Sequence, residues 1–151
     1  MAIESDLYTA VTKRIVEILK GDTRLGRDLP TTVQVEKGPF REVPGPDNLV
    51  FVYRQRLGTE FWQGMEGVDV DVVYGLDLVT RALADPEELE ERCSILAANV
   101  LAIIADHRSE PGYWIVKSFG PSVAYSVRRG EQHVVELERV PVGLELNGVD
   151  L

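Results

Sequence analysis

Chemically reactive residue types are scarce in this chain of 151 residues, which contains one cysteine and two histidines. The single Cys93 excludes an intrachain disulfide framework and any zinc site built on several thiolates, and it favours a protein made in a reducing cytoplasm. His107 and His133 lack the HxH or HxxxH spacing of paired metal ligands. We therefore expect no metal site and no cofactor.

Basic residues are also in the minority, with 16 Lys and Arg against 25 Asp and Glu and a net charge of −9. This balance argues against a surface that binds nucleic acid by neutralising phosphates, and against docking on an anionic membrane. The longest apolar stretch lies near Ala97–Ala105 and is too short to span a bilayer. The first residues, MAIESDLYTAV, carry acids where a signal peptide has basic residues. The expectation is a soluble protein.

Motifs of known enzyme classes are missing as well. The sequence has no glycine-rich phosphate loop and no GxSxG turn, so we expect no catalytic residues and no enzymatic activity. One alternative stays open at Asp69 and Asp71, which lie two residues apart and share one face of an expected strand. Two carboxylates in that arrangement suit Mg²⁺ in a small hydrolase, or they keep that face of the sheet hydrated.

Apolar periodicity predicts two main helices. The first has apolar residues at helical spacing and a stop at Gly21: Ile3, Leu7, Val11, Ile15 and Ile18. The second starts at Asp85-Pro86-Glu87-Glu88 and runs to about His107, with an apolar stripe at Leu89, Cys93, Leu96, Val100 and Ile103. From Ala97 to Ala105 only Asn99 is polar. The second helix therefore needs cover on more than one side, from the first helix or from a neighbouring subunit.

Alternating apolar residues predict six strands, near 31–36, 49–56, 68–80, 113–119, 122–128 and 132–146. The resulting order, α-β-β-β-α-β-β-β, predicts a single domain over 1–151 of the α+β class. A mostly antiparallel sheet would have the two main helices packed on it.

Three features of these strands predict irregularities. Gly75 indicates a bulge or bend in strand 68–80. In the last strand Val135 and Leu137 follow one alternation phase and the apolar residues from Val140 onward follow the other, which predicts a bulge near Glu138–Pro141. Pro141 cannot donate a ladder hydrogen bond, so it predicts a sheet edge.

Two connecting segments are candidates for binding partners. Segment 37–48 holds three prolines and two glycines, and segment 58–67 places two aromatic residues between glycines. Aromatic residues on loops are common interface anchors, although they also serve as core plugs. Twelve of the 16 basic residues are Arg, which suits ion-paired interfaces or reflects a GC-rich genome. The interface candidates are Phe40, Arg41, Arg54, Arg56, Phe61, Trp62 and Pro141.

The order of these segments resembles the tail terminator proteins of long-tailed bacteriophages, also called tail-completion or minor tail protein U-like proteins. The resemblance is carried by the opening helix MAIESDLYTAVTKRIVEILKGD and the proline-rich loop. It continues in the long strand VDVDVVYGLDLVTRA, which runs directly into the helix DPEELEERCSILAANVLAIIADHR, and in the closing strand HVVELERVPVGLEL. It spans nearly the whole chain and lies in architecture and size, because no signature motif is present.

The resemblance implies a structural virion protein of the tail or neck, assembled in the host bacterial cytoplasm. Such proteins form a hexameric ring on the head-proximal end of the tail tube. The ring ends tube polymerisation and joins the tail to the head connector. The implied partners are copies of the same chain, the tail tube protein and the connector or stopper protein. DNA would pass through the ring without specific binding, and Asp69, Asp71 and Asp77 are candidates for an acidic lumen.

Three alternatives remain at this point. One is a head–tail joining or stopper protein of the neck. The second is the Mg-dependent hydrolase that uses Asp69 and Asp71. The third is a small-ligand binding module, which predicts an apolar cavity between the sheet and the second helix.

Overall fold

The computed structural model describes residues 3–41, 43–44, 47–55, 61–63, 68–81, 86–129 and 132–149. Within these ranges the side chains at 3–7, 61–63, 68–70, 86, 127–129, 132–134 and 147–149 lie outside the description. The N-terminal elements are α1 (Ile3–Gly21), the short 3₁₀ helix η1 (Thr23–Gly26), β1 (Val33–Lys37) and β2 (Asn48–Gln55). They are followed by β3 (Phe61–Gln63), β4 (Val68–Arg81), α2 (Pro86–Asp106) and β5 (Ser109–Glu110). The last elements are β6 (Trp114–Phe119), β7 (Val123–Arg129) and β8 (Gln132–Val149).

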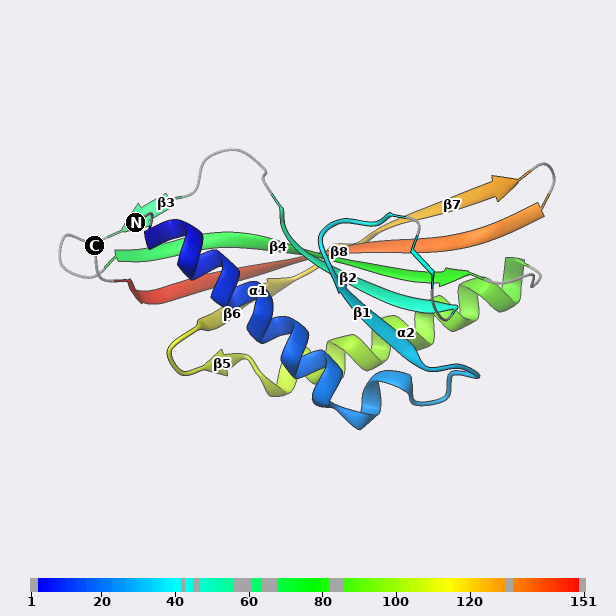
Figure 1. The fold of residues 1–151 in the computed structure, drawn as a ribbon, viewed down its shortest axis with the longest axis horizontal. Coiled ribbons are helices and arrows are strands. Elements are labelled where there is room, and N and C mark those ends of the chain that lie inside the picture. Colours follow the sequence, from blue (N-terminus) through cyan, green and yellow to red (C-terminus); the bar gives the residue numbers. More distant parts are fainter. Residues whose placement is uncertain are drawn as a thin grey trace.

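One twisted sheet carries the fold, with two helices beside it (Figure 1). The strand order is β1-β2-β4-β8-β6-β5, with β3 paired to β4 and β7 paired to β8. The β1–β2 pair is parallel and the other pairs are antiparallel. The α+β class and the mostly antiparallel sheet are therefore confirmed. The sequence analysis did not predict η1, β3 or β5.

Both helices pack on the same face of the sheet. Apolar residues of α1 and α2 meet even-numbered residues of β4 and β8 in one core, which includes Leu19, Leu96, Tyr74 and Leu144. A second, smaller cluster lies on the opposite face, where Leu49, Phe51, Val79, Val135 and Leu137 are buried beneath Phe40 and Val43 of the segment after β1. The central strands are therefore covered on both faces.

This double cover explains why the last strand changes its apolar phase without a bulge. β8 keeps one continuous register with β4 from Val135 to Leu146. Val135 and Leu137 face the smaller cluster, whereas Val140 and the even residues after it face the helices. The predicted bulge near Glu138–Pro141 is therefore wrong.

Pro141 lies inside the sheet, and the prediction of a sheet edge there is wrong. β8 has β4 on one side and both β6 and β7 on the other. The carbonyl of Pro141 accepts a hydrogen bond of 2.8 Å from the backbone N–H of Gly120, which lies between β6 and β7. Because the amide nitrogen and carbonyl oxygen of one strand residue point to the same side, the missing N–H of Pro141 faces this junction and breaks no bond to β4.

Gly75 does not mark a bulge either, because the registers of β4 with β2 and β8 are continuous there. Its role is space: a Cβ atom at Gly75 would lie 2.4 Å from Cζ of Tyr53. The ring of Tyr53 therefore lies directly over the glycine. In the described residues, no helix is long and apolar enough to cross a membrane.

Candidate functional site

The outward face of α2 is only partly covered in the protomer. Asn99 donates hydrogen bonds of 3.1 and 2.9 Å to the carbonyls of Leu25 and Arg27, so the segment around η1 covers one flank of the helix. The next side of α2 stays open and carries the exposed residues Ala98, Leu101, Ala102 and Ala105, with Leu101 46% exposed. The sequence prediction that this helix needs a second cover is thus met by η1 on one flank only.

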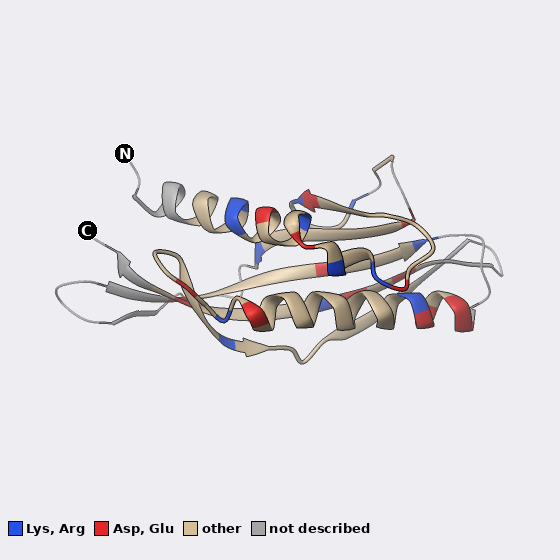
Figure 2. Ribbon diagram, turned by 90° about the horizontal axis from the view of Figure 1, so that it is seen from below, with Lys and Arg blue, Asp and Glu red and all other residues tan. Residues whose placement is uncertain are grey.

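Several acidic residues lie toward the N-terminal end of α2, which is coloured red there in Figure 2. Glu87, Glu90 and Glu91 are exposed and form no ion pair within the described residues. Beside them a groove of about 410 Å³ separates α2 from the β7–β8 hairpin. Glu90, Glu136 and Glu138 contribute carboxylates to its lining, so this end of the molecule is strongly acidic.

Cys93 lies at the base of this groove but is not a reactive thiol. Its Sγ is 3.8 Å from the carbonyl oxygen of Leu78, and the residue is buried. Burial, and then the nearby charges of Glu138 and Glu136, raise the pKa of Cys93 from 9.0 to about 12. The thiol is therefore protonated at neutral pH, and packing is its role.

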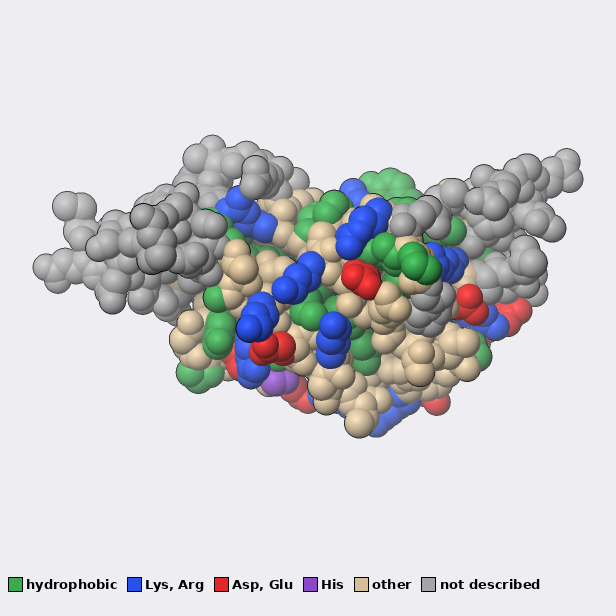
Figure 3. All heavy atoms as spheres, viewed as in Figure 1, with side chains coloured by type: hydrophobic (Ala, Val, Ile, Leu, Met, Phe, Trp, Pro, Cys, Tyr) green, Lys and Arg blue, Asp and Glu red, His purple; other side chains and the backbone are tan. Residues whose placement is uncertain are grey.

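Basic side chains run across the face that carries α1, in the view of Figure 3. Lys13 and Lys20 are exposed on α1 and form no ion pair in the part of the chain that the structure describes. Arg14, by contrast, has a partner within the chain, because its Nε donates a 2.9 Å hydrogen bond to Glu110. That bond, followed by one from His107, lowers the pKa of Glu110. The exposed lysines lie on α1, where Glu17 is exposed as well, whereas the start of α2 carries the exposed Glu87, Glu90 and Glu91.

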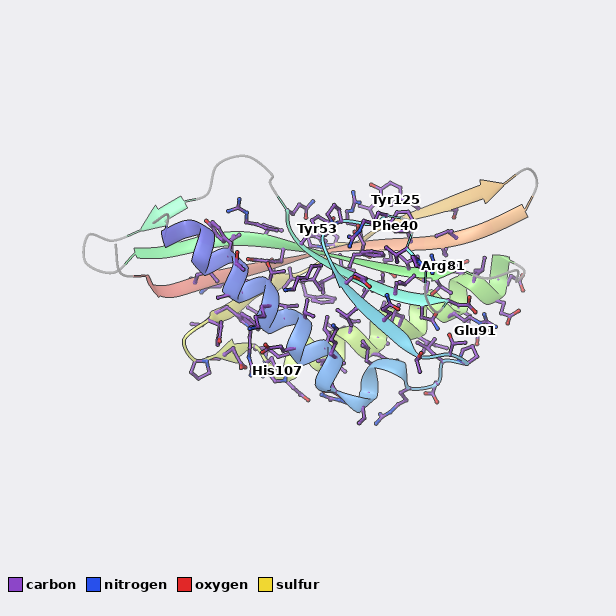
Figure 4. The ribbon with its side chains drawn as sticks, viewed as in Figure 1. Phe40, Tyr53, Arg81, Glu91, His107 and Tyr125 are labelled. Carbon is purple, nitrogen blue, oxygen red and sulfur yellow. The ribbon has the colours of Figure 1, made fainter. Side chains whose placement is uncertain are left out.

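The face of the sheet opposite the helices holds a buried ion pair. Asp77 is fully buried and accepts hydrogen bonds of 2.8 and 3.1 Å from Nε and Nη2 of Arg139. The hydroxyl of Tyr53 and the backbone N–H of Phe40 each donate a further bond of 3.1 Å to its carboxylate. Figure 4 shows Phe40, Tyr53 and Tyr125 gathered over this part of the sheet. The guanidinium of Arg139 lies 5.8 Å from the ring centroids of Tyr53 and Tyr125.

The lumen candidates are therefore not equivalent. Asp71 is exposed, as a residue that lines a channel must be. The side chain of Asp69 lies outside the described residues. The prediction that Asp77 lines a lumen is wrong. Arg139 and the segment at Phe40 bury this residue, so it cannot contribute a carboxylate to a solvent-filled wall.

The interface candidates also differ in their exposure and contacts. Phe40 packs edge-on against Phe51 at a centroid distance of 5.7 Å and closes the smaller core. Arg41 is exposed, and the guanidinium of Arg54 lies 3.9 Å above the ring of Tyr8. Pro141 lies within the sheet as described above. Arg56 and the side chains of Phe61 and Trp62 lie outside the described residues, although the backbone of β3 pairs with β4.

The sequence analysis did not identify two exposed apolar residues on β7 as interface candidates. Val123 and Tyr125 are 51% and 48% exposed. They pair across the strands with Arg139 and Leu137 on the face opposite the helices. Their alternation predicted a strand face, but no local signal distinguishes a covered face from an open one.

The alternatives based on bound ligands gain no support from the described side chains. No group of three or more His, Cys, Asp or Glu is placed to hold a metal ion within the part that is described. A cavity of about 10 Å³ lies between the helices and the sheet, lined by residues that include Tyr74, Ile104 and Trp114. Such a volume holds one water molecule at most, so it is not a site for an organic ligand.

Comparison with known proteins identifies a shared fold. No protein-family model and no curated protein matches the sequence. Among solved structures, the chain is similar to a chain in the virion of a native gene transfer agent particle. The TM-score is 0.62 at 15% sequence identity, and the match covers 93% of this chain and 98% of the other. The two folds therefore agree over nearly their whole lengths.

Proposed function

We propose that the protein is a structural component of a bacteriophage-like virion, and that it acts there as the tail terminator. The observation that carries the proposal is the likeness of fold, over nearly the whole chain, to a component of a gene transfer agent virion. The order of helices and strands, which resembles tail terminators, leads independently to the same class of protein.

In this function a ring of copies binds the head-proximal end of the tail tube. Its tube-facing side matches the last layer of tube subunits, and its other side differs from that layer, so polymerisation stops. The partly open face of α2 supports a ring, because contacts between unlike surfaces of neighbouring copies close into rings. The buried ion pair and the small second core hold Arg41 and Tyr125 on one surface, which is suited to contact with the tube or the connector.

The acidic balance suits a passage for DNA. Carboxylates repel phosphates and avoid the counterion-release affinity that would hold a moving duplex. Asp71 and Asp69 remain the proposed lumen residues, and no catalytic step is part of the function. A head–tail joining protein of the neck would share these properties and differ in its partner, because it would bind the connector and not the tail tube.

The test is to mix the purified protein with tail tubes of the same particle and to image the mixture by negative-stain electron microscopy. The expected result is ring-shaped density at one tube end and an arrest of further tube growth when tube subunits are added. Native mass spectrometry of the protein alone measures the number of copies in the ring. Binding to the connector without binding to tubes would identify a joining protein, and a protein that binds neither would refute the virion function.

A further inference from the structure

We propose that the contact between neighbouring copies is an antiparallel pair of helices, in which α1 of one copy packs on the open face of α2 of the next. This inference rests on the proposed ring and identifies the surfaces that close it. The occupant of the α2 face is thus a second copy of this chain.

The open face of α2 changes character along its length. Its first half carries the exposed residues Glu87, Glu91 and Ser94, and its second half carries the exposed residues Ala98, Leu101, Ala102 and Ala105. Their spacings of three and four residues place them on one side of the helix. In Figure 2 the charged end of α2 gives way to a long uncharged stretch. A partner that fits must offer cations opposite the first half and small side chains opposite the second.

The exposed face of α1 offers this pattern in reverse order. Thr9 and Ala10 are small and exposed in its first half, and Lys13 and Lys20 are exposed in its second half. The acid between them, Glu17, lies 3.6 Å from Arg14 of the same helix. The two lysines, by contrast, have no ion-pair partner in the described part of the protomer. An antiparallel pairing therefore brings the two lysines, together with the Arg14–Glu17 pair between them, to the acids, and the small residues to the apolar half.

The lengths of the helices agree with this alignment, since α1 has 19 residues and α2 has 21. Placing Lys20 opposite Glu87 brings Glu17 opposite Glu90, Lys13 opposite Ser94 and Ala10 opposite Ala97, next to Ala98. Lys13 is then three residues from Glu91 along the axis, about 4.5 Å at a rise of 1.5 Å per residue, which a lysine side chain spans. Small residues at the crossing let the two backbones approach closely.

The two surfaces belong to different elements of one chain, since both helices contribute to the same core and each leaves an outer face exposed. A contact between two different surfaces of one chain is heterologous and repeats around a closed ring. Exposed ion pairs contribute little to affinity, so the charges select the partner surface and the apolar half adds to the affinity.

Charge reversal tests this contact. One variant carries Lys13→Glu and Lys20→Glu, and the other carries Glu87→Lys and Glu91→Lys. The expected result is that neither variant forms rings alone, whereas a 1:1 mixture restores them, because each copy then alternates with a complementary neighbour. A chain that carries all four substitutions is expected to form rings by itself. Circular dichroism verifies that each variant is folded, and native mass spectrometry reads the composition of the mixed ring.

The matched control reverses an exposed charge elsewhere. Lys37→Glu on β1 replaces one exposed cation by an anion and is expected to leave the ring unchanged. As a second measurement, Ala10→Cys combined with Ala98→Cys is expected to give a ladder of disulfide-linked copies on a denaturing gel. If each reversal variant forms rings by itself, as the wild type does, the proposed helix contact is overturned, and the proposed tube capping is not affected. If the wild-type protein forms no rings and caps no tubes, both the helix contact and the proposed function are overturned.

Discussion

Removing one partner of the Asp77–Arg139 ion pair is expected to destabilise the fold unequally, depending on which partner is lost. Asp77 is fully buried, whereas the side chain of Arg139 is 36% exposed. In Arg139→Met the carboxylate keeps the bonds from Tyr53 and Phe40 but remains as a buried charge without a counter-ion. We expect a loss of about 3–5 kcal/mol in the free energy of unfolding, the range for a broken buried pair.

Asp77→Asn is expected to cost less, about 1–3 kcal/mol. The amide oxygen still accepts a hydrogen bond from the loop or from Tyr53, and water reaches the partly exposed guanidinium that is left behind. The hydrogen bonds that Arg139 donates to Asp77 also raise the pKa of Arg139.

Urea unfolding followed by circular dichroism measures both losses, at one protein concentration because the proposed assembly would add to the apparent stability. The control is Lys117→Met, which removes an ion pair of 2.8 Å to Glu145 whose lysine is 55% exposed. That change is expected to cost less than about 1 kcal/mol. The reasoning is refuted if Asp77→Asn is at least as costly as Arg139→Met, or if neither exceeds the control.

Three further predictions follow from the described contacts. Gly75→Ala places a Cβ 2.4 Å from the ring of Tyr53 and is expected to cost about 1–3 kcal/mol in thermal or urea unfolding; an unchanged midpoint would contradict the close packing. Hydrogen bonds from Arg24 lower the pKa of Asp22 from 3.8 to about 2. Their stabilisation is therefore complete above pH 4 and lost as the pH falls toward 2, and Asp22→Asn should flatten the acid limb of a stability–pH profile. Cys93, with its pKa raised to about 12, should resist a thiol reagent at pH 8 in the folded protein and react after denaturation; rapid labelling of the native state would show that the thiol is open.

Elements with strong local signals were predictable from the sequence. The Asp-Pro-Glu-Glu start and the apolar stripe of α2 indicated a helix that begins at Pro86, and all five stripe residues are buried. The alternation in strand 68–80 likewise indicated β4 within one residue of its end. These signals are local, because helix caps and side-chain periodicity depend on residues at most a few positions apart.

The candidate site was less predictable, because exposure depends on contacts between distant segments. Asp77 has the same alternation as Asp71, yet Arg139, 62 positions along the chain, buries it. Val123 and Tyr125 are exposed because no segment covers that part of β7 among the described residues. The sequence predicted that the second helix is apolar on more than one side. It did not predict that the segment around η1 covers one flank of this helix.

By itself the sequence determined the fold class and most element bounds of this protein, since these follow from periodicity and caps within short windows. Long-range packing, by contrast, places the missing N–H of Pro141 beside the β6–β7 junction, where it breaks no bond to β4. It also places the ring of Tyr53 over Gly75. The same holds for the separation of exposed acids on α2 from exposed lysines on α1. The physical reason is that a strand or helix specifies which side chains share a face, whereas the packing of remote segments decides which of those faces water reaches.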